Sequence, residues 1–220
     1  MKIRTMSGLL CAAFLLLLSP REGRASTSIC DSIANNLVSS CGFESGTAWS
    51  VSGNDVPGGL NNLFGVEGVD PFDGIAPHSG NYQAFVADLV DNATTFSQTI
   101  TTIPGGQYTV SLFLAQDTAA TGTCNAVACA NEFDVTLDGI TVFDYTDVPV
   151  EGYTEYIGTV DVSDASSVLN ITLGNDLGEF LLDDVSVVAT PEPSSLMLVL
   201  GVVILGCAFR LVRRAPPAIR

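Results

Sequence analysis

Residues 132–145 have the sequence EFDVTLDGITVFDY, in which one alternating segment is followed by a turn and a second alternating segment. Phe133, Val135 and Leu137 alternate with acidic and threonine side chains, so they would share one face of a strand. Asp138-Gly139 is a favoured two-residue turn between antiparallel strands. The stretch therefore predicts a β-hairpin with one apolar face.

The same period-two alternation recurs through the middle of the chain. In QYTVSLFLAQ, residues 107–116, every second side chain from Tyr108 to Leu114 is apolar and would face one side of a strand. About eight or nine short strands separated by Gly and Pro predict an all-β fold, an antiparallel β-sandwich of jelly-roll type. The glycine-rich stretch 52–74 is expected to be a long loop at one rim. Further strands are expected at 82–87, 94–101, 154–162, 168–173 and 180–188.

The N-terminal segment differs from this middle part. Lys2 and Arg4 precede an apolar run at 9–18 and a small-residue exit at 23–25, which is the layout of a cleaved secretory signal. We therefore expect a signal helix over residues 1–25 and a sandwich domain over residues 26–188.

The C-terminal segment has three parts. Residues 189–193 contain Pro191, Glu192 and Pro193, which cannot extend a sheet and indicate a linker. Residues 194–214 hold an uncharged run, 196–209, which predicts a single transmembrane helix, although it is short for a hydrocarbon core of about 30 Å. A buried amphipathic helix is the alternative, but the run has no polar face. The basic residues that follow, Arg210, Arg213 and Arg214, place the tail 215–220 in the cytoplasm and the domain outside.

Charge is distributed very unevenly along the chain. All 8 Lys and Arg residues lie outside residues 26–190, whereas all but two of the 24 acidic residues, Glu22 and Glu192, lie inside. The domain therefore has no Lys or Arg for an internal salt bridge, and its surface would repel nucleic acid. Metal cations or positively charged partners are the natural counter-ions, and solubility through like charge is the simpler alternative.

Four cysteines lie in the expected exported part: Cys30, Cys41, Cys124 and Cys129. In an oxidising compartment they predict two disulfides, for which three connectivities exist. The local pairs Cys30–Cys41 and Cys124–Cys129 are favoured because each closes a short loop. A zinc site is the alternative, but neither spacing is a CxxC and His78, the sole histidine, is distant in sequence.

The order Pro191-Glu192-Pro193, apolar run and arginine cluster at the C-terminus resembles the PEP-CTERM sorting signal. The resemblance implies that a membrane enzyme, an exosortase, is a partner of the chain. It also implies export, retention in the inner membrane with the domain outside, and processing with delivery to the cell envelope or an exopolysaccharide matrix such as a biofilm. The residues APPAIR after the arginines depart from the family pattern.

The segments NLVSSCGFESGTAWSV, PHSGNYQAFV, FSQTITTIPGGQYTVSLFLA and FLLDDVSVV resemble, in this order, the galactose-binding-like jelly rolls, which include many carbohydrate-binding modules. The resemblance spans about residues 36–188. It implies a structural calcium held by Glu44 and Asp183, with a third ligand from backbone carbonyls around 78–80. Relatives often have Asn where this chain has Cys41.

The adjacent pair Asp183 and Asp184 has a further consequence. Consecutive strand residues point to opposite faces, so the two carboxylates are expected to diverge. Both faces of this strand are apolar, and a partly buried carboxylate needs backbone donors, a proton or a cation such as Ca²⁺. A hydrogen-bonded Asp at a strand end is the alternative to calcium.

Three functions remain open. The first is a non-catalytic, envelope-sorted protein of the cell surface or matrix, whose acidic face would contact polysaccharide through Ca²⁺. The second is a specific carbohydrate-binding module that stacks sugar rings on an exposed aromatic, with Trp49 as the first candidate. The third, an enzyme, is the least favoured, because APHSGN around His78 matches no catalytic motif. The other aromatic candidates are Tyr82, Tyr145, Tyr153 and Tyr156.

Overall fold

The computed structural model of this chain describes residues 27–45, 48–53, 64–71, 74–117, 123–124, 127–128, 130–149, 151–176 and 178–190. The predicted signal peptide, the sorting motif at Pro191 to Pro193, the apolar run, the three arginines and Cys129 lie outside these residues. Among the described residues, no helix combines the length and apolar character needed to cross a membrane.

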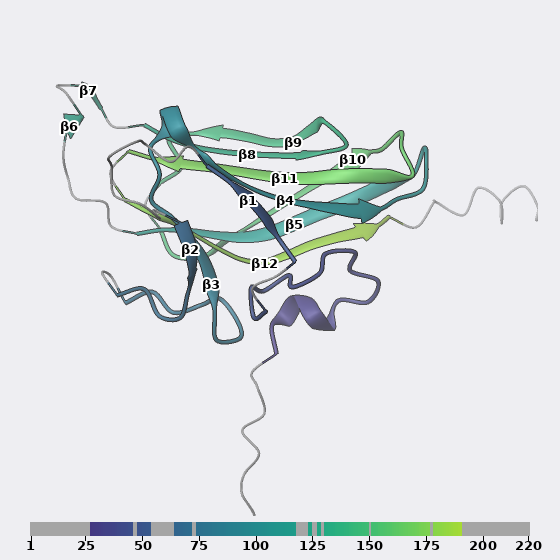
Figure 1. Cartoon of the computed structure of the whole chain (residues 1–220), viewed down its shortest axis with the longest axis horizontal. Helices are drawn as coiled ribbons and strands as arrows, with labels where there is room; N and C mark the ends of the chain where they lie inside the picture. The colour runs from purple at the N-terminus through teal and green to yellow at the C-terminus, as the bar shows by residue number, and fades with distance from the viewer. Residues whose placement is uncertain are drawn as a thin grey trace, which may run out of the picture.

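Two five-stranded antiparallel sheets pack face to face and form the body of the molecule (Figure 1). The first sheet has the order β1-β4-β11-β8-β9, and the second has the order β10-β5-β12-β3-β2. The predicted antiparallel β-sandwich is therefore confirmed, and it is consistent with the jelly-roll type. The strands of the first sheet are β1 (Ser50–Ser52), β4 (Thr94–Thr101), β8 (Asn131–Leu137), β9 (Ile140–Thr146) and β11 (Ser166–Asn175). Those of the second are β2 (Phe64–Glu67), β3 (Gln83–Val86), β5 (Gln107–Gln116), β10 (Thr154–Asp161) and β12 (Phe180–Ala189).

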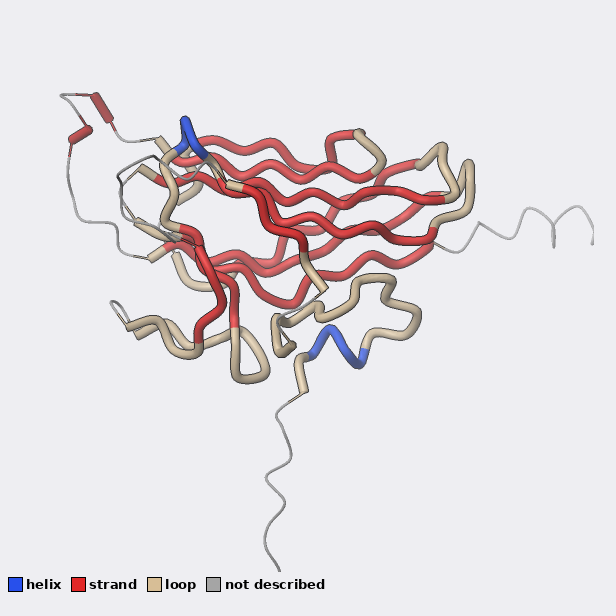
Figure 2. The backbone as a smooth tube through the Cα atoms, viewed as in Figure 1, coloured by secondary structure: helices blue, strands red, loops and turns tan. Residues whose placement is uncertain are grey.

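A third pair of very short strands, β6 (Thr123–Cys124) and β7 (Val127–Ala128), stands apart from the sandwich (Figure 1). The helices of the described part are two 3₁₀ turns, η2 (Ile29–Ser32) and η3 (Val90–Asn92), coloured blue in Figure 2. The expectation of one long loop over 52–74 is wrong, because β2 forms within that stretch and pairs with β3. Phe64 and Val66 favour a strand because aromatic and β-branched side chains pack well in sheets, although the stretch around them is rich in glycine.

The hairpin predicted from residues 132–145 is confirmed as β8 and β9. Asp138 and Gly139 both have positive φ angles, 58° and 72°, as a type I′ turn requires. The Asp138 carboxylate also accepts hydrogen bonds from the backbone N–H and the hydroxyl of Ser163. These contacts tie the hairpin turn to the loop between β10 and β11.

The core lies between the two sheets and is built from the alternating apolar side chains. On β8, Phe133, Val135 and Leu137 are fully buried, and Val110 and Leu112 of β5 face them from the second sheet. The polar outward face of the first sheet carries Ser, Thr, Asn and acidic residues. Amphipathic strands of this kind bury one face each, which is what the sequence pattern requires.

The N-terminal segment, coloured purple in Figure 1, lies beneath β12. The N–H of Leu37 donates to the carbonyl of Val187, and the N–H of Val185 donates to the carbonyl of Cys41. The predicted disulfide between Cys30 and Cys41 is present, with the two Cα atoms 6.0 Å apart. Both sulfur atoms are therefore bonded to each other, which rules out a zinc site on this pair in the folded structure. The second predicted pair cannot be placed because Cys129 is outside the described residues.

Candidate functional site

The last strand carries a bulge at the two adjacent acids. Its pairing with β5 shifts register between Asp183 and Ser186, and Asp184 has a positive φ of 49°. As a result, both carboxylates bond to Ser79, in the loop that covers the outer face of the second sheet. The prediction that the two side chains diverge to opposite faces is wrong, because an ordinary strand alternation does not survive a bulge.

Asp184 joins three segments of the chain. Its carboxylate accepts hydrogen bonds from the hydroxyls of Ser28 and Ser79 and from the N–H of Cys30, and it lies 2.7 Å from Nδ1 of His78. Burial alone would raise the pKa of Asp184, but the hydrogen bonds from Ser28, Ser79 and His78 lower it below its ordinary value. Asp184 is therefore an ionised anchor for the N-terminal segment and for the loop that contains His78.

His78 is held by packing as well as by this bond. Its ring stacks on Phe113 of β5 with 3.6 Å between centroids, and it meets the ring of Tyr153 edge-on. The hydroxyls of Ser28 and Ser79 donate to Asp184 and not to the imidazole of His78. The described contacts therefore do not form a catalytic triad, in which a histidine lies between the nucleophilic hydroxyl and the carboxylate. Asp183 and Asp184 are 0% and 2% exposed, so a substrate has no access to them.

Glu44 and Asp183, the two residues to which calcium was assigned by resemblance, reach the same loop. Oε1 of Glu44 accepts hydrogen bonds from the N–H groups of Asn81 and Tyr82, at 2.6 and 3.0 Å. Oδ2 of Asp183 accepts one from the N–H of Ser79, at 3.0 Å. The loop between these amides passes through Gly80, where φ is +70° and a Cβ would lie 2.0 Å from Oε1 of Glu44. Only glycine allows the carboxylate to lie against the backbone here.

Burial makes the ionised form of Asp183 unfavourable in the folded domain. Burial, followed by the charge of Asp184, raises its pKa to about 7, although hydrogen bonds from backbone N–H groups oppose the shift. Its two described partners are backbone amides, the N–H groups of Ser79 and Asp184.

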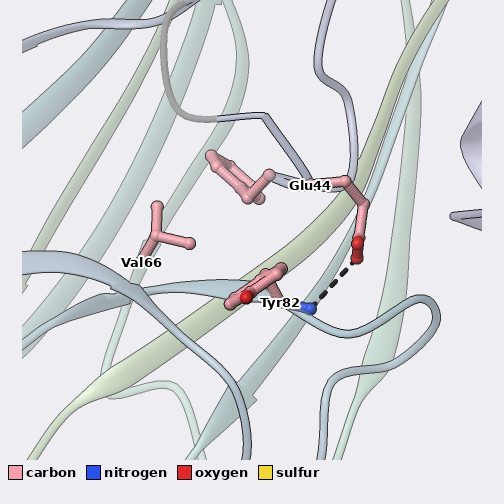
Figure 3. Close-up of a pocket in the computed structure, with 4 residues that line it drawn as sticks. Glu44, Val66 and Tyr82 are labelled. Atoms are coloured by element: carbon pink, nitrogen blue, oxygen red, sulfur yellow. Dashed lines mark hydrogen bonds between the residues drawn. The ribbon is translucent and has the colours of Figure 1, made fainter. Parts of the chain in front are cut away.

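A shallow pocket of about 210 Å³ opens beside this loop, lined by Phe43, Glu44, Val66 and Tyr82 (Figure 3). The dashed line in Figure 3 marks the bond from the Tyr82 N–H to Glu44, which fixes the backbone that carries the ring. Tyr82 is 46% exposed and Val66 is also exposed, whereas Phe43 is buried behind them. The pocket therefore combines an accessible aromatic ring, an apolar side chain and a carboxylate.

The other aromatic candidates have different surroundings. Trp49 is half-buried, stacks on Phe43 and meets Phe96 edge-on, and its indole N–H donates to the carbonyl of Ser40. Tyr153 donates its hydroxyl hydrogen to the side chain of Gln83. Tyr145 is 46% exposed and packs with Tyr156 where β9 and β10 meet. Trp49 thus packs as part of the core boundary, and Tyr82 has the more accessible ring.

The chain matches no family model and no curated protein. Solved structures with a similar fold include TmCBM61 in complex with β-1,4-galactotriose, 19% identical, which covers 71% of this chain and 100% of that one, with a TM-score of 0.49. Another is the C-terminal family 22 carbohydrate-binding module of Clostridium thermocellum Xyn10B, 14% identical, covering 73% and 98%, with a TM-score of 0.48. A third is the enzymatically active domain of bacteriophage CBA120 tailspike protein 4, 18% identical, covering 70% and 21%, with a TM-score of 0.46. These structural neighbours are mostly carbohydrate-binding modules, and their low similarity assigns no ligand to this chain.

Proposed function

We propose that the described domain is a non-catalytic carbohydrate-binding module, with a sugar ring stacking on Tyr82 in the pocket of Figure 3. The observation that carries the proposal is the exposed Tyr82 ring on a backbone that Glu44 holds in place. The apolar face of a pyranose packs on such a ring, and the carboxylate of Glu44 accepts hydrogen bonds from sugar hydroxyls.

The charge of the domain restricts the class of sugar. No Lys or Arg occurs between residues 26 and 190, so the domain offers no cationic side chain to a uronic acid or a sulfated sugar. A surface with many carboxylates repels such polyanions at ordinary ionic strength. The ligand is therefore a neutral glycan, unless a bound cation bridges two negative surfaces.

The geometry around His78 supports the non-catalytic part of the proposal. The buried acids beside it serve as hydrogen-bond acceptors for backbone and serine groups, and the imidazole is packed between Phe113 and Tyr153. A glycosidase needs two carboxylates that face each other across the substrate cleft, whereas the described lining of the pocket in Figure 3 holds the carboxylate of Glu44 alone.

The test is binding of the purified full chain to a panel of neutral β-linked oligosaccharides, such as galacto-, xylo- and cello-oligosaccharides, measured by calorimetry. Saturable binding to a neutral glycan that is lost in Tyr82→Ala would support the proposal. Turnover of a glycan, or binding that is unchanged in Tyr82→Ala, would contradict it.

We also propose that Ca²⁺ binds between Glu44 and Asp183 and holds the loop from Ser79 to Tyr82 that forms one wall of the pocket. Support comes from the convergence of both carboxylates on that loop, from the burial of Asp183 and from the oxygen chemistry that calcium prefers. A chelator should lower the melting temperature of the full chain, and Asp183→Asn should remove that sensitivity at this site.

For the C-terminal segment, we propose the exosortase-read sorting signal that the sequence indicates. Its support is the order of Pro191-Glu192-Pro193, the apolar run and the arginines in the sequence. Intact mass and cell fractionation of the protein from its host, with and without the sorting enzyme, would test it. A full-length form that stays in the inner membrane in both strains would contradict processing.

A further inference from the structure

Three carboxylates that sequence analysis did not single out meet at another place on the second sheet. Glu67 ends β2, Asp70 follows it in the loop, and Glu179 immediately precedes β12. One carboxylate oxygen from each of the three lies within 4.8 Å of those of the other two. Asp70 and Glu179 are 2% and 5% exposed, so two of the three acids are withdrawn from water.

The positions of these acids are fixed by their neighbours. The N–H of Glu179 donates to Oδ1 of Asp117 at 2.8 Å, and the N–H of Asp117 donates to the carbonyl of Glu179. The N–H of Asp70 donates to the carbonyl of Ile75, so this carbonyl lies beside the cluster. Gln83 donates through Nε2 to both Glu67 and Ile75, at 3.3 Å each. These hydrogen bonds connect the segments that carry the three acids.

The negative charge of the cluster has no cationic partner in the domain, because residues 26–190 contain no Lys or Arg. Among the described residues, Oε1 of Glu179 is buried and has no hydrogen-bond partner. A buried carboxylate oxygen without a partner is strongly unfavourable. One carboxylate oxygen of Glu179 lies within 4.8 Å of those of Glu67 and Asp70, and a side-chain hydrogen bond joins Glu179 to Asp70. A partner for Oε1 of Glu179 would therefore lie beside this group.

A proton or a metal ion could occupy this position. Burial, followed by the charges of Glu67, Asp70 and Asp117, raises the pKa of Glu179 to about 8, so without metal the cluster retains a proton near neutral pH. A divalent cation neutralises more charge than one proton does. Hard cations such as Ca²⁺ take six to eight oxygen ligands, and carboxylates with a backbone carbonyl are the usual donors.

We propose that Glu67, Asp70 and Glu179 form a binding site for one Ca²⁺ ion, separate from the position between Glu44 and Asp183. The ion joins the end of β2 and its following loop to the start of β12. This site does not depend on sugar binding, so it stands independently of the proposed function.

The test is calcium titration of the chelator-treated full chain by calorimetry, together with the variant Glu179→Gln. The variant keeps the size of the side chain and removes its charge. We expect it to bind one ion fewer per chain than the wild type, or to bind that ion about 10-fold or more weakly. Asp183→Asn should leave this site intact. Glu132→Gln, on the outer face of the first sheet near Asp134 and Asp144, is the matched control and should bind calcium as the wild type does.

Protein stability separates loss of the site from loss of the fold. In chelator at pH 9, above the pKa of about 8 of Glu179, Glu179→Gln should melt at or above the wild-type temperature, because the buried negative charge that Glu179 carries at that pH has been removed. In calcium, the wild type should gain stability and the variant should gain less. If Glu179→Gln fails to fold, Glu67→Gln, at a more accessible position, gives the same comparison. Unchanged calcium stoichiometry and affinity in a folded variant would overturn the proposal, whatever the result at Glu44 and Asp183.

Discussion

Nδ1 of His78 lies 2.7 Å from Oδ2 of Asp184, although the two residues are 106 positions apart in the chain. The contact depends on the backbone of Asp184, whose positive φ turns its side chain to the outer face of the second sheet. The hydroxyls of Ser28 and Ser79 donate to the same carboxylate. The buried Asp184 therefore connects the N-terminal segment and the loop that contains His78 to β12.

Replacing Asp184 by Ala should lower the free energy of unfolding by about 3 kcal/mol, because several buried donors lose their acceptor and Ala is strained at positive φ. Asp184→Asn should cost less, since Asn tolerates this backbone region and keeps one acceptor oxygen. Urea unfolding of the two variants checks the order. Equal losses in both, or a loss below about 1 kcal/mol in Asp184→Ala, would contradict the anchoring role.

Removing the disulfide with Cys30→Ser and Cys41→Ser should lower the free energy of unfolding by about 2–4 kcal/mol. The N-terminal segment would then be held mainly by its hydrogen bonds to Asp184, Val185 and Val187. Unfolding of the double variant and of the wild type, each with and without reductant, measures this. Any further loss in the reduced double variant would report on the predicted pair Cys124–Cys129.

Tyr82→Ala should weaken glycan binding by about 10-fold or more and lower the melting temperature less than Trp49→Ala does, since the Tyr82 side chain is 46% exposed. Trp49→Ala is the matched aromatic control. It should lower the free energy of unfolding by about 2 kcal/mol, because its ring packs on Phe43 and Phe96. If Trp49→Ala abolishes binding without destabilising the fold, the sugar site lies at Trp49 and not at Tyr82.

In chelator, the domain should be more stable at pH 5 than at pH 9. The pKa of Asp183 is raised to about 7 and that of Glu179 to about 8, mainly through burial. A raised pKa means that the folded state holds its protons more tightly, so this stabilisation is complete below the unfolded pKa near 4 and is lost as pH rises through 7 and 8.

Urea midpoints from pH 5 to pH 9 in chelator measure this dependence. Glu179→Gln should reduce the fall of the urea midpoint at the high-pH end of this range. Added calcium should restore the stability of the wild type at high pH, because metal binding requires deprotonated carboxylates. Asp184 has a lowered pKa and contributes the opposite sign, a loss confined to strongly acidic pH. A midpoint that rises between pH 5 and pH 8 in chelator would refute the prediction.

Sequence alone predicted the strands well where alternation is regular. The segment 94–101 is β4 with the expected bounds, and the Asp138-Gly139 turn has the expected dihedral angles. It failed at Asp183 and Asp184, since a bulge is a property of the pairing with β5 and leaves no mark in the alternation of one strand. The disulfide between Cys30 and Cys41 could be predicted because the two residues are only 11 positions apart and close a short loop.

The cluster of Glu67, Asp70 and Glu179 could not be predicted from the sequence, for a different reason. In a domain with so many acids, any three can be chosen from the sequence, and only the fold shows which three converge. Similarly, Trp49 and Tyr82 were both aromatic candidates for sugar stacking in the sequence. Their difference in exposure follows from Phe43 and Phe96, which pack against Trp49 from distant parts of the chain.

The last strand, β12, lies between β5 and β3 in the middle of its sheet, and the first described segment bonds to it through Leu37 and Cys41. A growing chain therefore lacks the centre of its second sheet until nearly all of the domain has been made. Contacts between distant ends form late and slow folding. If residues 1–25 are the signal peptide that the sequence predicts and the chain crosses a membrane N-terminus first, β12 is the last strand to cross, and the second sheet can be completed only on the far side.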